Sequence, residues 1–538
     1  MMRSDTKTLL TRGCLALALL LFAAAGIVHA SNRLTVALAS AEIESNRFWQ
    51  ATWGNFQQYE PMLETLIGND PVTGEPIPRL AESWEHNDDY SVWTFYLRQG
   101  VPFHFGYGEF TAADVRHSWE LITREESLLH GWWRDEVKEV EIVDDYTITF
   151  HFHNPVYEAE RRFSRTGTNL YIVSKAQWDA TGEDGMELEL AGTGAYQFKE
   201  RIQGRSVLME RVDDHWRDSP AFAELEFRWV PDAVTRTAML LAGEVDMAHV
   251  GRDQADDAVS MGMEILTSQQ DNMQVVATFE WVYLDSELSV GEPTEDNVML
   301  DPLVREALNR AIDREVIRDM LYSGRAAPLA LWGWHPVNMG WDPEWEERFD
   351  DMYGYDPDKA REILAEAGYG PGELEFTVYS YLLAGQPEIP DLVEALHLFW
   401  TQIGANVHIE DIDFGIFGER TRARQTQPGV RITRNTPIRS MDEFIELWHR
   451  PGGRPGTTAY IDDTTVDLYH QFRQATTAAE RDRLARAFGD YLFEQYATMP
   501  IASTRVEVVV NPDVVQAWTW PGEAPSTFTH WYEVVPAQ

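Results

Sequence analysis

Hydrophobic and polar residues alternate between positions 91 and 98, and this alternation predicts a β-strand. Trp93, Phe95 and Leu97 lie on one side of the run, and the residues between them lie on the other. Aromatic and β-branched side chains with a period of two are typical of a half-buried strand. Turn residues at 87–89 precede the run and Gly100 follows it, so the strand is expected to be short.

A helix is predicted directly after this strand. Thr111 and Asp114 have the spacing of a capping box, and Val115 and Trp119 follow on one helical face. Other segments are interpreted in the same way. The predicted elements are a strand at 34–38, helices at 302–314, 357–367 and 479–497, a hairpin at 137–152, and a return strand at 506–510.

Residues 76–120 resemble a signature of family 5 of the extracellular solute-binding proteins, the dipeptide- and oligopeptide-binding subunits of ABC importers. Residues 302–314 and 355–369 resemble two further family segments, and the resemblance extends over nearly the whole chain. Residues 59–67 resemble a helix of the family, so the resemblance implies a helix there. Phe105-Gly106 departs from the family's Asp-Gly. The matching residues of the first segment are Pro78, Leu80, Ala81, Glu82, Ser83, Trp84, Thr94, Phe95, Leu97, Arg98, Gly100, Phe103, His104, Phe110, Thr111, Ala112, Asp114, Val115 and Ser118.

This resemblance implies an α/β, two-lobed periplasmic binding protein fold of type II, cluster C, with an extra sub-domain in the first lobe. The expected division is a signal peptide at 1–30, lobe I at 31–58, its extra sub-domain at 59–175, and lobe I again at 176–275. Lobe II is expected at 276–502, and a C-terminal return to lobe I at 503–538.

The N-terminus has the pattern of a cleavable signal peptide. Arg3, Lys7 and Arg12 precede an apolar run from 15 to 28, which is too short to span a bilayer comfortably. We expect cleavage after Ala30, export to the periplasm and no stable membrane insertion. Cys14 is the chain's only cysteine and lies within this segment, so the cleaved protein would have neither disulfides nor a thiolate metal site.

Composition supports a folded protein with an unusual charge. The 538 residues are 44% hydrophobic, enough for two or three domains. Cleavage would leave 41 basic and 87 acidic residues, a net charge of −46. Such a surface repels nucleic acid and anionic lipid. It favours a salt-tolerant source, because concentrated salt screens repulsion between carboxylates; recognition of a cationic ligand is the alternative.

Catalytic motifs are missing from the sequence. It contains no nucleophile elbow, no His-Glu-x-x-His and no phosphate loop with its lysine. Gly192-Thr193-Gly194 could cradle a phosphate, but a strand pattern follows it, and a turn where the lobes meet is the preferred interpretation. We therefore expect a binding protein without enzymatic activity and without a cofactor. A secreted carbohydrate-active enzyme, suggested by the twenty tryptophans, and a structural scaffold are the rival hypotheses.

The resemblance implies that a small-molecule ligand is enclosed between the lobes. Aromatic side chains supply contact area in such clefts, although core packing is the favoured interpretation of each one taken alone. His335 and His449 are isolated from other metal-ligating residues, so no metal site is predicted. The aromatic candidates for ligand binding are Trp132, Trp133, Trp332, Trp334, Tyr379 and Tyr381.

Residues 431–444 depart from the peptide-binding members of the family. There the comparable stretch carries an aspartate that pairs with the α-amino group of the peptide, and Pro437 occupies that position here. Arg434 and Arg439 lie close by and could grip a carboxylate or sugar hydroxyls. A peptide or peptide-like solute, an oligosaccharide, a sugar acid and an opine-like ligand all remain open. The expected partners are the importer's permease subunits with their ATPases, and the protein is expected to be a monomer.

Overall fold

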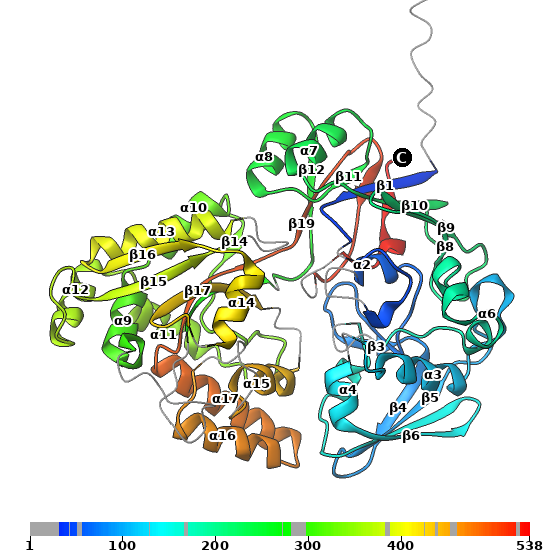
Figure 1. Ribbon diagram of the computed structural model, residues 1–538, viewed down its shortest axis with the longest axis horizontal. Coiled ribbons are helices and arrows are strands. Elements are labelled where there is room, and N and C mark those ends of the chain that lie inside the picture. The colour runs from blue at the N-terminus through cyan, green and yellow to red at the C-terminus, as the bar shows by residue number, and fades with distance from the viewer. Residues whose placement is uncertain are drawn as a thin grey trace, which may run out of the picture.

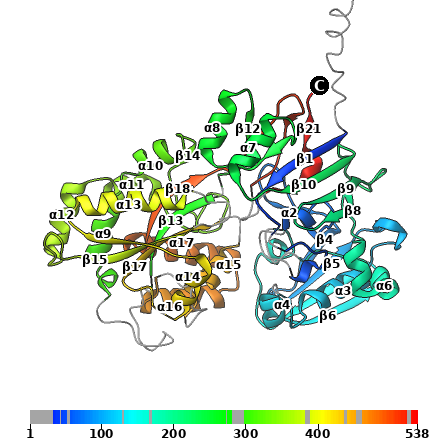
Figure 2. The same cartoon turned by 45° about the horizontal axis from the view of Figure 1, so that its top comes forward.

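The computed structural model describes residues 32–538 apart from 42, 51–55, 128–129, 166–169, 272, 281–296, 382–387, 424, 436–439, 452–459 and 523–527. Helices and strands form two bodies that lie side by side in two views (Figures 1 and 2). We name the body that contains the first strand lobe I and the other body lobe II. The expected signal peptide and the cleavage site at Ala30 lie outside the described residues.

Lobe I is built on a seven-stranded mixed sheet. The first strand of this sheet pairs in parallel with two neighbours. A strand from the C-terminal part of the chain pairs in antiparallel orientation with two other strands of the sheet. The expected strand at 34–38 and the expected return of the chain at 506–510 are both confirmed. The strand order is β12 (Glu264–Thr267), β19 (Glu507–Val510), β11 (Met247–Ala248), β1 (Arg33–Leu38), β10 (Glu224–Trp229), β9 (Ser206–Arg211) and β8 (Tyr196–Ile202).

A four-stranded antiparallel sheet forms the other part of lobe I. Its order is β4 (Ala81–His86), β5 (Val92–Leu97), β7 (Thr147–Phe152) and β6 (Val137–Asp144). Strand β5 buries Trp93, Phe95 and Leu97, and β6 and β7 form the expected hairpin. Helix α3 (Ala112–Ile122) begins with the expected capping box, in which the Thr111 amide donates to Asp114 Oδ2 at 2.8 Å.

The expected helix at 59–67 is wrong. Helix α2 (Phe56–Tyr59) ends where that helix was expected to begin, and β2 (Ile67–Asn69) pairs with β3 (Pro76–Pro78). Backbone groups between them bond to distant segments: the Met62 carbonyl accepts from the Gly194 amide at 3.0 Å, and the Glu64 carbonyl from the Ile172 amide at 2.9 Å. These long-range hydrogen bonds replace the bonds that the same backbone groups would make within a helix.

The turn at Gly192 makes a close contact within lobe I. A Cβ atom at Gly192 would lie 2.1 Å from the Met62 carbonyl oxygen, so only glycine fits this close approach. The turn therefore packs against another segment of lobe I, and its expected place where the lobes meet stays a prediction.

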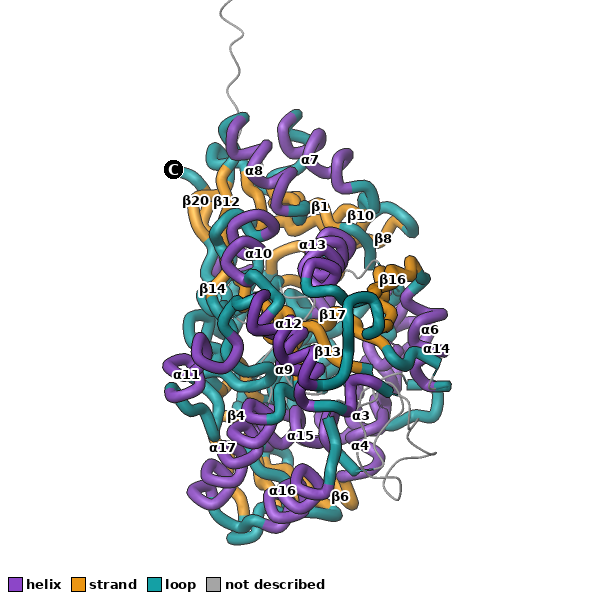
Figure 3. The backbone as a smooth tube through the Cα atoms, turned by 90° about the vertical axis from the view of Figure 1, so that its left-hand side faces the viewer, coloured by secondary structure: helices purple, strands orange, loops and turns teal. Residues whose placement is uncertain are grey.

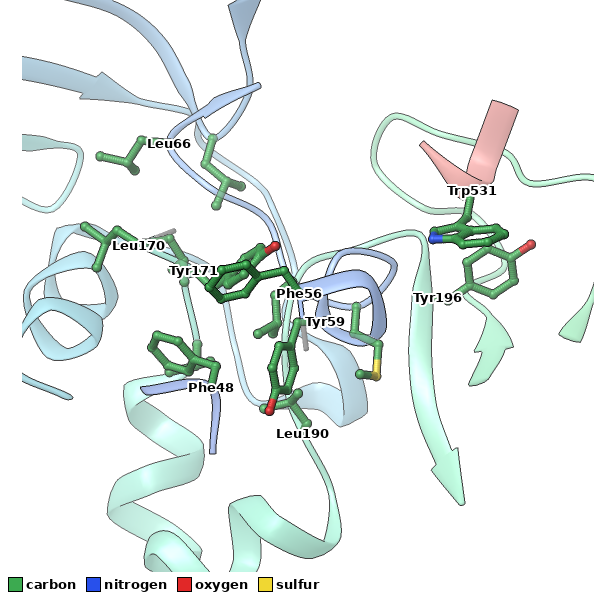
Figure 4. Close-up of a cluster of buried hydrophobic side chains, with 14 of the residues drawn as sticks. Phe48, Phe56, Tyr59, Leu66, Leu170, Tyr171, Leu190, Tyr196 and Trp531 are labelled. Atoms are coloured by element: carbon green, nitrogen blue, oxygen red, sulfur yellow. The ribbon is translucent and has the colours of Figure 1, made fainter. Parts of the chain in front are cut away.

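The core of lobe I joins residues from distant parts of the chain (Figure 4). Tyr171 contacts Phe48 and Tyr59, with ring centroids 6.4 and 6.3 Å apart. Trp531, close to the C-terminus, packs against Phe227 of β10, with ring centroids 4.8 Å apart. The remaining elements of this lobe are α4 (His130–Glu136), α5 (Ala159–Arg162), α6 (Lys175–Leu188), α7 (Ala233–Leu241), α8 (Arg252–Ser260), β20 (Val515–Ala517) and β21 (Val535–Pro536).

Lobe II is built on a six-stranded sheet. Strand β15 is parallel to β16 and β17, and the other pairs are antiparallel. The strand order is β14 (Ala326–Ala327), β18 (Thr498–Thr504), β13 (Met273–Phe279), β17 (Gly429–Asn435), β15 (Glu375–Ser380) and β16 (Asn406–Asp411).

The helices of lobe II include those expected from the sequence. Asp356 caps α12 by accepting from the Lys359 amide at 2.8 Å, and the expected helix at 302–314 is α9, followed after a short break by α10. Figure 3 shows α9, α12 and α13 on the outer side of this lobe. The helices are α9 (Pro302–Arg310), α10 (Arg314–Leu321), α11 (Glu344–Tyr353), α12 (Pro357–Glu366), α13 (Ile389–Gln402), α14 (Phe414–Arg422), α15 (Met441–His449), α16 (Asp463–Gln474) and α17 (Ala478–Glu494).

The chain crosses between the sheets of the two lobes after β12, at 268–271, and after β18, at 505–506. These crossings run side by side: the Ser268 amide donates to the Val506 carbonyl at 2.9 Å, and the Val506 amide donates to Ser268 Oγ at 3.0 Å. We propose that they form a two-segment hinge and mark the lobe boundaries, close to the expected limits at 275 and 502.

Candidate functional site

The two faces of the lobe II sheet are covered differently. Phe376 of β15 packs against Trp400 of α13, with ring centroids 5.5 Å apart. Tyr379, which points to the opposite face, packs against Phe417 of α14 at 5.1 Å. Helix α14 lies on the side of lobe II that looks toward lobe I (Figure 1). The face that carries Tyr379 is therefore the one directed to the other lobe.

A pocket of about 340 Å³ opens at the carboxyl ends of β15 and β16. The chain leaves β15 for α13 on one face of the sheet and leaves β16 for α14 on the other. Such a reversal between neighbouring parallel strands creates a crevice, the usual place for a ligand in an open α/β sheet. The lining residues are Ser380, Tyr381, Pro390, Asp411 and Ile412.

Aromatic rings flank this pocket. Tyr381 contacts both Phe417 and Phe414, with centroids 5.1 Å apart in each case, and its hydroxyl donates to the Ile432 carbonyl. Phe414 is 46% exposed, so its ring can meet a ligand. Burial raises the pKa of the Tyr379 hydroxyl to about 12 and raises that of Tyr381 as well, so both phenols stay protonated near neutral pH.

A buried ion pair lies on the same face. Glu280 Oε1 is 3.0 Å from Arg431 Nε, and Thr426 Oγ1 donates to Glu280 Oε2 at 2.8 Å. The Arg431 guanidinium also lies between two rings, 5.9 Å from the centroid of Phe417 and 5.8 Å from that of Trp448. This arrangement fixes the guanidinium beneath the aromatic surface.

Trp332 and Trp334 enclose one side chain of α15. Phe444 lies 5.2 Å from Trp332 and 5.4 Å from Trp334, between ring centroids. Gly333 has a φ of +90°, and a Cβ atom there would lie 2.0 Å from the Phe444 ring, so the turn needs glycine. Both tryptophans are at most 2% exposed, and their role as ligand contacts stays a prediction.

The two tryptophans of α4 have different surroundings. Trp133 is fully buried and packs against Phe163, with centroids 5.2 Å apart. Trp132 is half-buried, and the Arg162 guanidinium lies 4.8 Å from the centroid of its ring. Arg162 also forms an ion pair with Glu443 of lobe II at 3.4 Å. Trp132 is therefore next to a contact between the lobes.

The arginine candidates cannot be placed in the same detail. The backbone of Arg434 belongs to β17 and pairs with Val275, while Arg439 and the family's anchor position, Pro437, lie outside the described residues. Their proposed contact with a ligand stays a prediction.

Sequence reasoning missed Glu280, Arg431 and Phe417. Arg431 lies within the segment 431–444 that the sequence singled out, but nothing in its spacing pointed to Glu280. The pair depends on the antiparallel register of β13 and β17, which sets Arg431 opposite Thr278, two residues from Glu280. A register of this kind between distant strands is not visible in the sequence.

The two isolated histidines are held by other contacts. His449 Nδ1 is 3.2 Å from the Tyr460 carbonyl, and burial lowers the pKa of this imidazole to about 4. His335 Nε2 lies 3.6 Å from an Asp271 carboxylate oxygen. Among the described residues, no group of three or more His, Cys, Asp or Glu side chains could hold a metal ion. Within the same ranges, no helix is long and apolar enough to cross a membrane.

Comparison with known proteins places the chain in a family. Residues 75–453 match the bacterial extracellular solute-binding proteins, family 5 Middle. The heme-binding protein A of Haemophilus influenzae is 25% identical over 410 residues, 70% of this chain and 68% of the relative. The dipeptide-binding protein of Escherichia coli K12 is 26% identical over 412 residues, 69% of each chain.

A similar solved structure supports the fold. The periplasmic binding protein DppA of Helicobacter pylori, in complex with the peptide STSA, has a TM-score of 0.70 at 22% identity, with 94% of this chain and 98% of that chain covered. The expected two-lobed α/β fold of the periplasmic binding proteins is thereby confirmed.

Proposed function

Because the chain belongs to family 5 of the bacterial extracellular solute-binding proteins, we propose that it captures a peptide or peptide-like solute for an ABC importer. The members of this family bind solutes and are not enzymes. After export and signal-peptide cleavage, the protein acts in the periplasm as a monomer and presents the closed complex to the permease subunits.

The observation that carries this proposal is the pocket at the carboxyl ends of β15 and β16, beside aromatic rings that lie on the face directed to lobe I. Apolar faces with a few directed polar groups are what an organic solute needs when it is removed from water. The peptide class is supported by the relatives, since the names of two similar proteins state a dipeptide and a bound peptide.

A second ligand class is favoured by one specific departure. Pro437 stands where the peptide-binding members carry the acid for the ligand's amino group, and Arg434 and Arg439 add positive charge nearby. An oligosaccharide, a sugar acid or an opine-like solute suits that change. The carrier role is the same in both cases.

Native mass spectrometry of protein purified from its own host tests the ligand class. A retained mass equal to a short peptide supports the main proposal, and a sugar or opine mass supports the second. The same solute, added to ligand-stripped protein, must raise the melting temperature in a stoichiometric manner without being consumed. Conversion of the solute into a product would contradict the carrier role.

A further inference from the structure

Tyr157 of lobe I and Arg481 of lobe II meet face to face. The Arg481 guanidinium carbon is 3.6 Å from the centroid of the Tyr157 ring and 4.0 Å from that of Phe472, a residue of its own lobe. A guanidinium between two aromatic faces gains cation–π attraction from both, and most when it is removed from water. Arg481 is 1% exposed and Tyr157 is 3% exposed, so this contact is fully buried.

A hydrogen bond accompanies the stacking. The Tyr157 hydroxyl donates to the Ala475 carbonyl, which follows α16 in lobe II. Tyr157 itself is anchored in lobe I through the adjacent Val156, whose amide donates to the Tyr90 carbonyl at 2.9 Å and whose carbonyl accepts from the Trp93 indole at 3.0 Å. The phenol therefore extends from one rigid lobe to the other.

Lobe II holds the Arg481 guanidinium in position by contacts of its own. Nη1 donates to the Phe472 carbonyl at 2.8 Å and Nη2 donates to Asp442 Oδ1 at 2.6 Å, while Arg473 approaches the same carboxylate at 3.2 Å. These bonds do not depend on lobe I. When the lobes separate, the Arg481 guanidinium loses the Tyr157 ring but keeps its ion pair with Asp442. Opening therefore does not leave this guanidinium without a counter-charge.

A second interlobe contact involves the residue that follows Asp442. Arg162 of α5 pairs with Glu443 of α15 at 3.4 Å, and Glu443 follows Asp442 in the sequence. Arg162 also stacks on Trp132 in its own lobe. The Arg162 side chain is 4% exposed, so water and salt screen this pair little.

These contacts lie away from the two crossings. Figure 1 shows α15, α16 and α17 at the bottom of lobe II, across from α4, whereas β19, which follows the second crossing, lies at the top. The lobes are thus joined by the chain at one end and by Tyr157, Arg162, Arg481 and Glu443 at the other. Helix α14, beside the candidate site, lies between these two ends in Figure 1.

We propose that Tyr157 and Arg162 of lobe I, with Arg481, Glu443 and the Ala475 carbonyl of lobe II, form a latch that holds the lobes closed without help from a ligand. The proposal goes beyond the proposed function, because it concerns the resting conformation and holds for any solute. All of the contacts are between protein groups, so none of them needs an atom of the ligand. The latch makes the empty protein closed and sets how fast a bound solute escapes.

The chain's only cysteine lies in the expected signal peptide, so the cleaved protein would have none. Cysteines introduced for spin labels would then be the only ones to react, which suits a distance measurement. Spin labels at Glu139→Cys of β6 and Asp467→Cys of α16, both exposed positions, report the separation of the lobes by pulsed electron resonance. The sample is stripped of solute by unfolding and refolding, and native mass spectrometry verifies that it is empty. We expect one short, narrow distance in the otherwise unchanged protein.

The test variants are Tyr157→Phe, Arg162→Gln and the two combined. Tyr157→Phe keeps the ring and removes the hydroxyl that bonds to Ala475, and Arg162→Gln removes the charge that faces Glu443. We expect a longer, broader distance distribution in both single variants and a mostly open population in the double variant. Circular dichroism and the melting temperature verify that each variant is folded.

Tyr353→Phe is the matched control, because the Tyr353 hydroxyl donates to the Phe493 carbonyl at 2.6 Å entirely within lobe II. This variant must keep the short distance. The proposal is overturned if the empty, unchanged protein already shows the long distance, or if the double variant shows the same distribution as the control.

Discussion

Glu280 and Arg431 form an ion pair, 3.0 Å between Oε1 and Nε, beneath the face of lobe II that is directed to lobe I. The Glu280 side chain is 2% exposed and that of Arg431 is 11% exposed, so the pair is almost removed from water. The carboxylate keeps a second bond, from Thr426. The charge at the base of the candidate site is therefore neutralised by the protein, and what remains for a ligand is the aromatic surface with the pocket beside it.

Glu280→Gln is expected to lower the free energy of unfolding by about 3 kcal/mol, because the buried guanidinium loses its closest counter-charge. Urea denaturation of the empty protein measures this loss. The control is Glu410→Gln, which breaks the Glu410–Arg420 pair near the same face, where both side chains are 39% exposed. That change should cost less than about 1 kcal/mol. Equal effects of the two substitutions would contradict the structural role given to Glu280.

Phe414→Ala is expected to weaken solute binding but not stability, whereas Trp334→Ala is expected to lower stability. The Phe414 ring is 46% exposed beside the pocket, so its loss should weaken solute binding about tenfold with little change in stability. Trp334 is fully buried, and its truncation should cost about 3–5 kcal/mol. Calorimetric titration with the solute identified by mass spectrometry, together with urea denaturation, measures both effects. Unchanged affinity in Phe414→Ala would remove this ring from the site.

Replacement of Arg434 and Arg439 with alanine is expected to abolish binding and to leave stability nearly unchanged. The two guanidiniums lie in the segment that departs from the peptide-binding members, and a carboxylate or hydroxyl ligand would need them. Calorimetric titration with the identified solute measures the affinity of the double variant. Arg348→Ala, at an exposed pair with Glu494 in lobe II, is the control for loss of positive charge. If the double variant binds as the control does, the arginines are not ligand contacts.

Two buried histidines make stability fall in acid. Burial lowers the pKa of His104 and of His449 to about 4, below the ordinary value of 6.5. His104 Nε2–H donates to the Gly194 carbonyl and Nδ1 accepts from the Gly192 amide, which holds a neutral tautomer. The unfolded chain binds these protons more tightly, so this stability is complete above about pH 6.5 and is lost as the pH falls toward 4. Urea midpoints between pH 4 and 8 measure the slope, which should be shallower in His104→Gln.

Glu158 should act with the opposite sign. Burial raises the pKa of its carboxyl to about 7, and the positive charge of Arg161 offsets only part of this shift. The folded state then binds the proton more tightly, so stability contributed by this group is present below about pH 4.5 and decreases as the pH rises to 7. Glu158→Gln should make the protein more stable at pH 8 but not at pH 4. A stability gain of the same size at both pH values would show that the charge of Glu158 is not the cause.

The excess of acidic residues predicts a salt dependence. The net charge would be −46 after the expected signal cleavage, and the acidic groups repel one another; ions screen this repulsion over about 10 Å at 0.1 M salt. We expect the urea midpoint to rise from low to high sodium chloride concentration. Potassium chloride should give the same rise, because screening depends on ionic strength. A midpoint that does not change with salt would contradict the salt-tolerant interpretation.

Local sequence patterns predicted strands and helix caps correctly where the interacting residues are close in sequence. The alternation at Trp93, Phe95 and Leu97, the Thr111–Asp114 capping box and the Asp356 cap each appear in the structure where the residues indicated them. The prediction of a helix at 59–67 was wrong because the partners of this segment are distant in sequence. Its backbone bonds to Gly194 and Ile172, and the pattern of a segment does not reveal which distant strand will bond to it.

The sequence by itself determined the family, the two-lobed α/β class and most local elements, because motifs, caps and alternation depend on neighbouring residues. Tertiary structure alone decided that Glu280 meets Arg431 and that Tyr157 covers Arg481. Strand register sets the first of these pairs, and the approach of two separately folded lobes sets the second. Neither is encoded in the spacing of residues along the chain.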